Sequence, residues 1–243
     1  AYEITYGDWS SDVCSSDLGL ELMSLSLYAL TALRRDHAVA TEAAMKYFVL
    51  GALASGFLLY GLSMMYGATG SLDHQRVFEV IGKGQANQAV LVFGVVFIVA
   101  GLAFKFGAAP FHMWVPDVYQ GAPTQVTGFM AGATKLVAFV ALARVALEAL
   151  PAEQHLWQPV LIVVAIVTII GGAIAALVQN DVKRMLSWSS VSAAGYGLIA
   201  IIVGTAYAYE GLLYYLVTYA AVAFGAFAVV EIFQRDQIGR AHV

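Results

Sequence analysis

Charged residues are scarce in this sequence. Asp, Glu, Lys and Arg make up 12% of its 243 residues, whereas a soluble domain carries about 25%. With 12 basic and 16 acidic residues, the chain lacks the positive excess typical of nucleic-acid binding, so we expect no nucleic-acid partner. Hydrophobic residues reach 60%. Because such a chain cannot cover itself with polar surface, we expect a lipid bilayer to surround it.

Cysteine is nearly absent and occurs once, at Cys14. A single cysteine excludes an internal disulfide and a thiolate metal centre built from several cysteines, including an iron–sulfur cluster. The sequence also lacks the glycine-rich loop between a strand and a helix that binds nucleotide phosphates. We therefore expect no cofactor or metal in this chain, and no redox chemistry of its own.

The two ends of the chain are polar and show no apolar period. DVCSSDL, at 12–18, can be encoded by GACGTGTGCTCTTCCGATCT, and the reverse complement of that string encodes IGRAHV, at 238–243. The string resembles a common sequencing adapter, whose further parts give DWSSDVCSSDL and AYEI. We predict that residues 1–18 and 237–243 are translated adapter and that 19–236 is an internal piece of a longer protein. The alternative is that both ends are genuine polar termini.

Seven segments are apolar enough to cross a membrane, which takes about 20 mostly apolar residues. Glycine is frequent inside them, and small residues let membrane helices approach closely. We predict an all-α, polytopic transmembrane helix bundle. Its segments are 19–33, 43–66, 88–119, 125–149, 158–178, 185–205 and 209–233.

The third segment, 88–119, is too long for one helix. A continuous helix over it would measure roughly 47 Å at about 1.5 Å per residue, against a hydrocarbon core of about 30 Å. It contains Gly107 and Pro110, and proline removes a backbone donor and disrupts the preceding turn. We predict a break near 107–110 and a second half-helix from about Phe111. Broken helices recur at ion sites in transporters.

Lys and Arg in short loops predict the orientation, because such loops stay in the cytoplasm. These residues occur between the first and second segments, between the fifth and sixth, and after the last. Alternation of the segments then predicts a cytoplasmic side made of 34–42, 107–124, 179–184 and 234–236.

Three ionisable residues lie far from the ends of their segments: Glu21, Lys105 and Lys135. A charge at the bilayer centre costs at least about 2.5–3.5 kcal/mol on insertion scales, so such residues are usually paired or hydrated. A nearby carboxylate favours the ammonium form of a lysine and burial disfavours it, so a lysine between the two effects can load and release a proton. We predict a proton relay through these three residues. The alternative is a buried structural ion pair.

His112 lies beside the predicted break, and imidazole titrates near neutrality, so it is a candidate additional relay. Hydrogen bonding to freed backbone carbonyls is the alternative. Lys46, Arg144 and Glu231 lie nearer to helix ends, where long charged side chains extend to the surface, and for them we favour a structural role. For the tyrosines of the last segment we favour an interfacial belt and packing over a proton wire, namely for Tyr207, Tyr209, Tyr214, Tyr215 and Tyr219.

Several stretches together resemble one family. GLELMSLSLYAL, AFKFGAAPFHMWVPDVYQGAPT, GATK and QNDVKRMLSWSS resemble the proton-translocating membrane subunits of NADH–quinone oxidoreductase (respiratory complex I), which belong to the antiporter-like superfamily. KYFVLGALASGFLLYG and YGATGS are most similar to the subunit N group, called subunit 2 in mitochondria. The likeness covers 19–236. It implies about fourteen helices in two inverted repeats, each with a broken helix, of which this chain would hold the fifth to the eleventh.

The resemblance also implies roles. Glu21 matches the family's fifth-helix glutamate, Lys105 its seventh-helix lysine and Lys135 its eighth-helix lysine, and together they would form the input half of a proton channel. Protons would move across a bacterial inner membrane when other subunits reduce quinone. NADH, FMN, iron–sulfur clusters and quinone would be bound by those other subunits, and the partners would be further membrane subunits of the complex.

One departure from the family pattern is Ala193, where many relatives have a histidine of the central relay. Either a water, Ser192 or Tyr196 replaces it, or the relay of this branch differs. Two other functions stay open. A cation/proton antiporter or membrane-hydrogenase subunit would have the same fold, but the subunit N stretches argue against it. A non-conducting membrane scaffold subunit is disfavoured by the charges at membrane depth.

Overall fold

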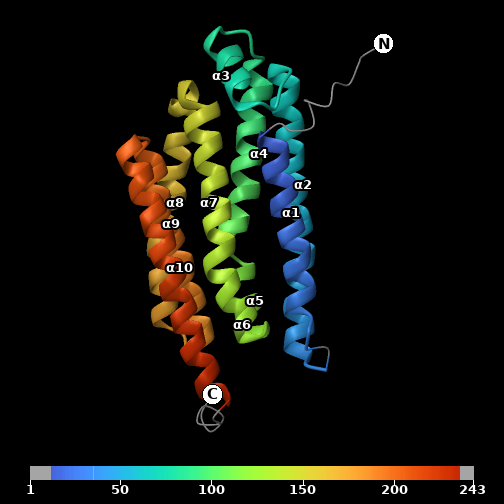
Figure 1. The fold of residues 1–243 in the computed structure, drawn as a ribbon, viewed down its shortest axis with the longest axis vertical. Coiled ribbons are helices and arrows are strands. Elements are labelled where there is room, and N and C mark those ends of the chain that lie inside the picture. Colours follow the sequence, from blue (N-terminus) through green and yellow to red (C-terminus); the bar gives the residue numbers. More distant parts are fainter. Residues whose placement is uncertain (1–11, 35, 236–243) are drawn as a thin grey trace.

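The long helices run side by side along the molecule, and the turns lie at its two ends (Figure 1). The computed structural model describes residues 12–34 and 36–235, and all regular secondary structure in this part of the chain is helical. The predicted all-α bundle is thus confirmed. The helices are α1 (Asp12–Thr31), α2 (Ala38–Thr69), α3 (His74–Gly82), α4 (Gln88–Phe106), α5 (Trp114–Gly121), α6 (Thr124–Phe129), α7 (Lys135–Arg144), α8 (Gln154–Leu177), α9 (Val182–Val203) and α10 (Ala206–Arg235).

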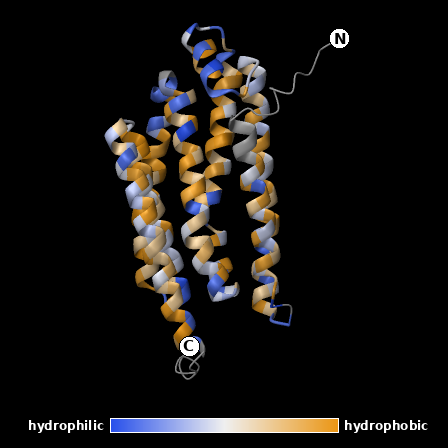
Figure 2. Cartoon of the chain, in the orientation of Figure 1, coloured by the Kyte–Doolittle hydropathy of each residue, from blue (hydrophilic) through white to orange (hydrophobic). Residues whose placement is uncertain are grey.

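Six helical spans among the described residues are long and apolar enough to cross a membrane, and they fall on the second to seventh predicted segments. One of them, Thr124–Ala149, joins α6 and α7 through a π-helical turn at Met130–Thr134 and ends in a second one at Val145–Ala149. The apolar part of α1 is shorter, at Leu18–Thr31, and covers most of the first predicted segment. Figure 2 shows hydrophobic residues along the shafts and hydrophilic residues gathered mostly at the ends.

The predicted adapter stretches lie largely outside the described residues. Of 1–18, the structure describes only 12–18, which form the first turns of α1. None of 237–243 is described. The origin of both ends therefore stays a prediction.

The predicted helix break is present. The helix α4 ends at Phe106, and Gly107 follows with φ +74°, a left-handed conformation that glycine adopts without strain. The second half-helix, α5, begins at Trp114 and not near Phe111 as predicted, because the intervening residues form turns. The freed N–H of Ala109 in these turns donates to Thr168 Oγ1 of α8 at 2.9 Å, so protein satisfies it at depth, as such a break requires.

The loop between α2 and α4 contains the short helix α3, for which we predicted no element. Asp73 caps it by accepting a hydrogen bond from the Arg76 N–H, and an N-cap of this kind satisfies one of the free donors of a first turn. Its residues Val77 and Ile81 are buried and stand four apart on one face. The Asp and the i, i+4 pair are signals from which the sequence would have predicted this helix.

Glycines let the paired helices approach closely. A Cβ at Gly61 of α2 would lie 2.7 Å from the backbone N of Ile98 on α4, and one at Gly101 of α4 would lie 2.8 Å from Leu58 Cβ on α2. On α8, a Cβ at Gly172 would lie 2.7 Å from the backbone N of Ser192 on α9. Such contacts require glycine, and they are the small-residue packing expected of membrane helices.

The predicted cytoplasmic loops gather at one end of the bundle. The α1–α2 turn, the α5–α6 joint and the end of α10 lie together at the lower end in Figure 1, opposite α3. This common end agrees with the predicted alternation of the segments.

Candidate functional site: two buried lysines at membrane depth

Lys105 lies in the last turn of α4, directly before the helix break. Only 6% of its surface is exposed, so its ammonium depends on protein partners. Its Nζ lies 2.7 Å from Glu21 Oε1 of α1. The structure therefore brings together two of the three residues that we predict to form the relay.

Two hydroxyls complete the surroundings of this pair. Lys105 Nζ donates to Ser24 Oγ at 2.8 Å and to Ser55 Oγ at 3.3 Å, and Ser55 Oγ donates to Glu21 Oε1 at 2.6 Å. Three helices thus meet at one ammonium, with α1 and α2 supplying partners for α4. Lys105, Glu21, Ser24 and Ser55 are called the Lys105 cluster below. The two serines were not predicted, because hydroxyls are common in membrane helices and only packing shows which ones face a charge.

The half-helix α5 supports the end of α4 beside this cluster. Trp114 Nε1 donates to the carbonyl oxygen of Phe104 at 2.9 Å, which also accepts a hydrogen bond from the N–H of Gly107 at 3.1 Å. The indole of Trp114 also stacks on Tyr47 of α2, with ring centroids 4.6 Å apart and an interplanar angle of 14°. The position of α5 therefore affects the turn of α4 that carries Lys105.

Lys135 is the first residue after the π-helical turn of the α6–α7 span and is 2% exposed. Its Nζ donates to the carbonyl oxygen of Ser190 on α9 and, at 2.6 Å, to Ser190 Oγ. The Nζ also lies 5.6 Å from the ring centroid of Tyr219 on α10, within the range of a cation–π contact. Tyr219 donates its hydroxyl to Ser190 Oγ at 2.8 Å. Lys135, Ser190 and Tyr219 form what is called the Lys135 cluster below.

The π-helical turn and the partners of Lys135 were not predicted. Such turns are rare and frequently occur at functional sites. For the neighbourhood of Ala193, the prediction named a water, Ser192 or Tyr196. The Ser192 hydroxyl donates to the carbonyl oxygen of Ile169 at 3.1 Å, and Tyr196 is 52% exposed. The replacement for the histidine stays a prediction.

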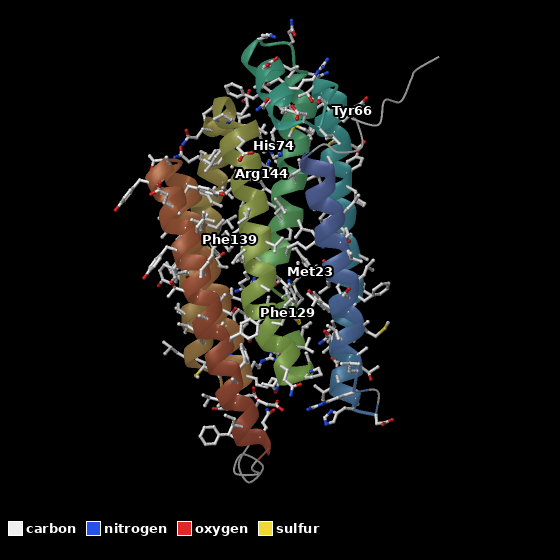
Figure 3. All side chains as sticks on the ribbon, viewed as in Figure 1. Met23, Tyr66, His74, Phe129, Phe139 and Arg144 are labelled. Atoms are coloured by element: carbon white, nitrogen blue, oxygen red, sulfur yellow. The ribbon has the colours of Figure 1, made fainter. Side chains whose placement is uncertain are left out.

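Apolar packing joins the two helices that carry the lysines. The helices α4 and α7 pack against each other, and the rings of Phe106 and Phe139 stack between them with centroids 4.5 Å apart. Figure 3 shows Phe139 midway along the bundle. Among the described residues, no direct hydrogen bond joins Lys105 or its partners to Lys135 or its partners. A proton passing between them would need water or a movement of side chains.

His112 lies in the turns between α4 and α5, outside both clusters. Its Nδ1 is buried without a hydrogen-bond partner in the described part of the chain, and its ring centroid lies 5.2 Å from that of Trp188. The alternative role that we considered, hydrogen bonding of this nitrogen to a freed carbonyl, is therefore not seen at Nδ1. His112 stays a candidate relay.

An ion-pair network lies at the predicted cytoplasmic end. Asp117 of α5 binds Lys46 Nζ of α2 through Oδ2 at 2.7 Å and Arg184 Nη1 of α9 through Oδ1 at 2.8 Å. Lys46 also binds Glu42 at 2.8 Å, and Arg184 donates to Gln120 Oε1 at 3.0 Å. Burial raises the pKa of Asp117, but the hydrogen bonds from Lys46 and Arg184 outweigh it, and the pKa lies below its usual range. The carboxylate therefore stays ionised at neutral pH.

The remaining charged residues named from the sequence have structural contacts. At the opposite end, Arg144 Nε lies 3.2 Å from Glu148 Oε2, and the same oxygen lies 3.0 Å from His74 Nδ1 of α3. Figure 3 shows His74 and Arg144 near one another there. Glu231 of α10 accepts from Gln125 at 3.0 Å.

The chain matches the family model described as "NADH:quinone oxidoreductase/Mrp antiporter, TM" over residues 10–241. It is 54% identical over 226 residues to NADH-quinone oxidoreductase subunit N of Herminiimonas arsenicoxydans, an alignment that covers 90% of this chain and 46% of the relative. The chain thus spans about half the length of the curated relatives that it matches.

Solved structures show the same fold. A chain of respiratory complex I from Thermus thermophilus is 41% identical with a TM-score of 0.75, over 88% of this chain and 45% of that one. A chain of the Mrp complex from Dietzia sp. has a TM-score of 0.82 at 21% identity, over 91% of this chain and 43% of that one. At that identity the second match shows likeness of fold alone.

Proposed function

We propose that this chain, which belongs to the NADH:quinone oxidoreductase/Mrp antiporter membrane family, conducts protons as part of a membrane-arm subunit of an NADH–quinone oxidoreductase. It is a multi-pass protein of the bacterial inner membrane. The predicted relay of Glu21, Lys105 and Lys135 forms the core of the proposal, with His112 as a candidate addition.

The observation that carries this proposal is the pair of the buried Lys105 and the half-buried Glu21 beside a helix break. Ionisable residues inside a membrane segment are costly and usually mark an ion or proton path. The 2.7 Å separation and the shared Ser55 hydroxyl give a proton two short routes between carboxylate and amine. A purely structural pair does not need the helix break.

Lys135 supplies a second buried proton-binding group. Its amine is held by neutral oxygens and an aromatic face, so its charge is balanced only by dipoles and not by a carboxylate among the described residues. A proton that leaves the Lys105 cluster would reach Lys135 through water or a movement of side chains. The direction of transfer would then follow the electrostatic state of neighbouring parts of the complex.

The redox work would be done elsewhere. We expect NADH, FMN, iron–sulfur clusters and quinone to be bound by other subunits, and the partners of this chain to be further membrane subunits. The high identity to a subunit N favours this assignment over a cation/proton antiporter, which shares the fold at lower identity. A non-conducting scaffold is disfavoured by the buried, polar surroundings of both lysines.

The test uses the full-length protein in its native complex. We expect Lys105→Ala to abolish NADH-driven proton uptake through this subunit in inverted membrane vesicles, measured as protons moved per NADH oxidised. Lys83→Ala is the matched control, because Lys83 is 62% exposed at the opposite end of the bundle, and it should change nothing. Pumping at the normal ratio by an assembled Lys105→Ala complex would show that the relay assignment is wrong. NADH-independent sodium/proton exchange would favour the antiporter.

A further inference from the structure

The half-helix α5 is too short to hold itself in place. It has eight residues and no side-chain cap at its N-terminus, and isolated helices below about 12–15 residues are marginal in water. Contacts with neighbouring helices must therefore set its position. It packs against α2 on one side and against α9 on the other.

One carboxylate makes ion pairs on both sides. Asp117 binds Lys46 of α2 with one oxygen and Arg184 of α9 with the other, at 2.7 and 2.8 Å. At the C-terminal end of α5, Lys183 Nζ donates to the carbonyl oxygen of Ala122 at 2.7 Å, where a cation also suits the helix dipole. The C-terminal end of α5 is thus hydrogen-bonded to α9, and Asp117 forms ion pairs with both α2 and α9.

The two helices that Asp117 bridges are those that supply hydroxyls to the two lysine clusters. Ser55, which contacts Lys105, lies on α2 nine residues after Lys46, or about 13 Å along a helix. Ser190, which contacts Lys135, lies on α9 six residues after Arg184, or about 9 Å. A shift of either helix against α5 would change the distance between a lysine and its hydroxyl.

The exposure of these ion pairs favours a role in positioning the helices over a role in stabilising the fold. The side chains of Lys46, Asp117 and Arg184 are 43%, 30% and 35% exposed, and ion pairs of such exposure contribute little to the stability of a fold. Removing them should leave the fold intact. A carboxylate shared by two cations nevertheless defines the spacing of the two helices that carry them.

We propose that Asp117 is a positioning residue that holds α2 and α9, and with them the Lys105 and Lys135 clusters, at the spacing that proton transfer requires. This inference rests on the proposed proton path. It assigns to the Lys46–Asp117–Arg184 network a function that the lysines alone do not explain.

The experiment compares protons moved per NADH in vesicles that contain the full-length protein in its complex. Asp117→Asn keeps the size of the side chain and removes its charge, and we expect the ratio to fall roughly two-fold or more while NADH oxidation and the amount of assembled complex stay normal. Asp117→Glu keeps the charge and should recover most of the loss. A glutamate no better than the asparagine would overturn the proposal, because a retained charge would then not matter.

Glu42→Gln is the matched control, since Glu42 contacts the same Lys46 at 2.8 Å but lies on α2 itself and bridges to no other helix. It should pump normally. A loss equal to that of Asp117→Asn would mean that the charge of Lys46 matters and the bridge does not, which would overturn the proposal.

A double variant tests whether both arms act as one unit. If Asp117 works as a bridge, Lys46→Gln and Arg184→Gln should each lose about as much as Asp117→Asn, and their combination should be no worse. If the losses of pumping in the two single variants add up in the double variant, Lys46 and Arg184 act independently, and Asp117 does not work as a bridge between them. Lys105→Ala is measured in the same experiment to separate the two proposals. If the Lys105→Ala complex pumps normally, the proposed proton path is wrong. If Lys105→Ala loses pumping but Asp117→Asn pumps normally, only the positioning role of Asp117 is wrong.

Discussion

The two membrane-depth lysines are similarly buried but have different partners. Lys105 has a carboxylate, Glu21, at 2.7 Å and two serine hydroxyls. Lys135 has a backbone carbonyl, one serine hydroxyl and the face of a tyrosine ring, and no carboxylate within ion-pair distance among the described residues. One site therefore contains two coupled charges, and the other contains a single charge surrounded by dipoles.

This difference predicts how each site responds to change. In a coupled pair, removal of one partner leaves the other charge buried and uncompensated, so each partner depends on the other. At a site with neutral partners, each contact can be removed separately, and the loss should follow the strength of that contact. Equivalent substitutions at the two sites should thus have unequal effects.

The largest effect is expected from Glu21→Ala. This substitution leaves the buried Lys105 ammonium without its carboxylate partner. Removing one partner of a buried ion pair destabilises the fold by about 3–5 kcal/mol. We expect much less assembled complex in the membrane, as measured on native gels, together with loss of pumping. Adding Lys105→Met removes the stranded charge and should restore assembly without restoring pumping. A double variant no more abundant than Glu21→Ala would show that the two residues are not coupled.

A smaller effect is expected from Ser190→Ala. The hydroxyl at 2.6 Å from Lys135 forms a hydrogen bond to a charged group, which contributes about 1.5–3 kcal/mol. Pumping should fall while assembly stays near normal. Ser192→Ala is the control, because that hydroxyl bonds the Ile169 carbonyl and does not contact Lys135. Equal losses in the two variants would contradict the Lys135 cluster.

The smallest effect is expected at Tyr219. Tyr219→Phe keeps the ring beside Lys135 and removes only the hydroxyl bound to Ser190, a neutral bond of about 0.5–1.5 kcal/mol. Tyr219→Leu also removes the aromatic face, which contributes about 0.5–2 kcal/mol. Pumping should therefore fall less in the phenylalanine variant than in the leucine variant. The reverse order would rule out a cation–π contribution.

Sequence reasoning succeeded where local properties decide and missed features that depend on packing. The break after Phe106 follows from Gly107 and Pro110, and it was predicted within a few residues. The π-helical turn before Lys135 was not predicted, because GFMAGATK reads as an ordinary helix. Tyr219 was assigned to packing, since a row of tyrosines on one helix does not show which of them points inward. Lys46 was considered structural, and its place in the Asp117 network became visible only from the structure.

The sequence by itself determined that this chain crosses a membrane repeatedly, that its third segment is broken, and that Glu21, Lys105 and Lys135 lie within apolar stretches. Hydrophobicity, helix-breaking residues and the cost of buried charge are local properties and can be read along the chain. Only the tertiary structure decided which of these residues meet. Lys105 pairs with Glu21 across 84 positions and Lys135 binds Ser190 across 55. Contacts over such separations depend on how whole helices pack, and no local pattern contains that information.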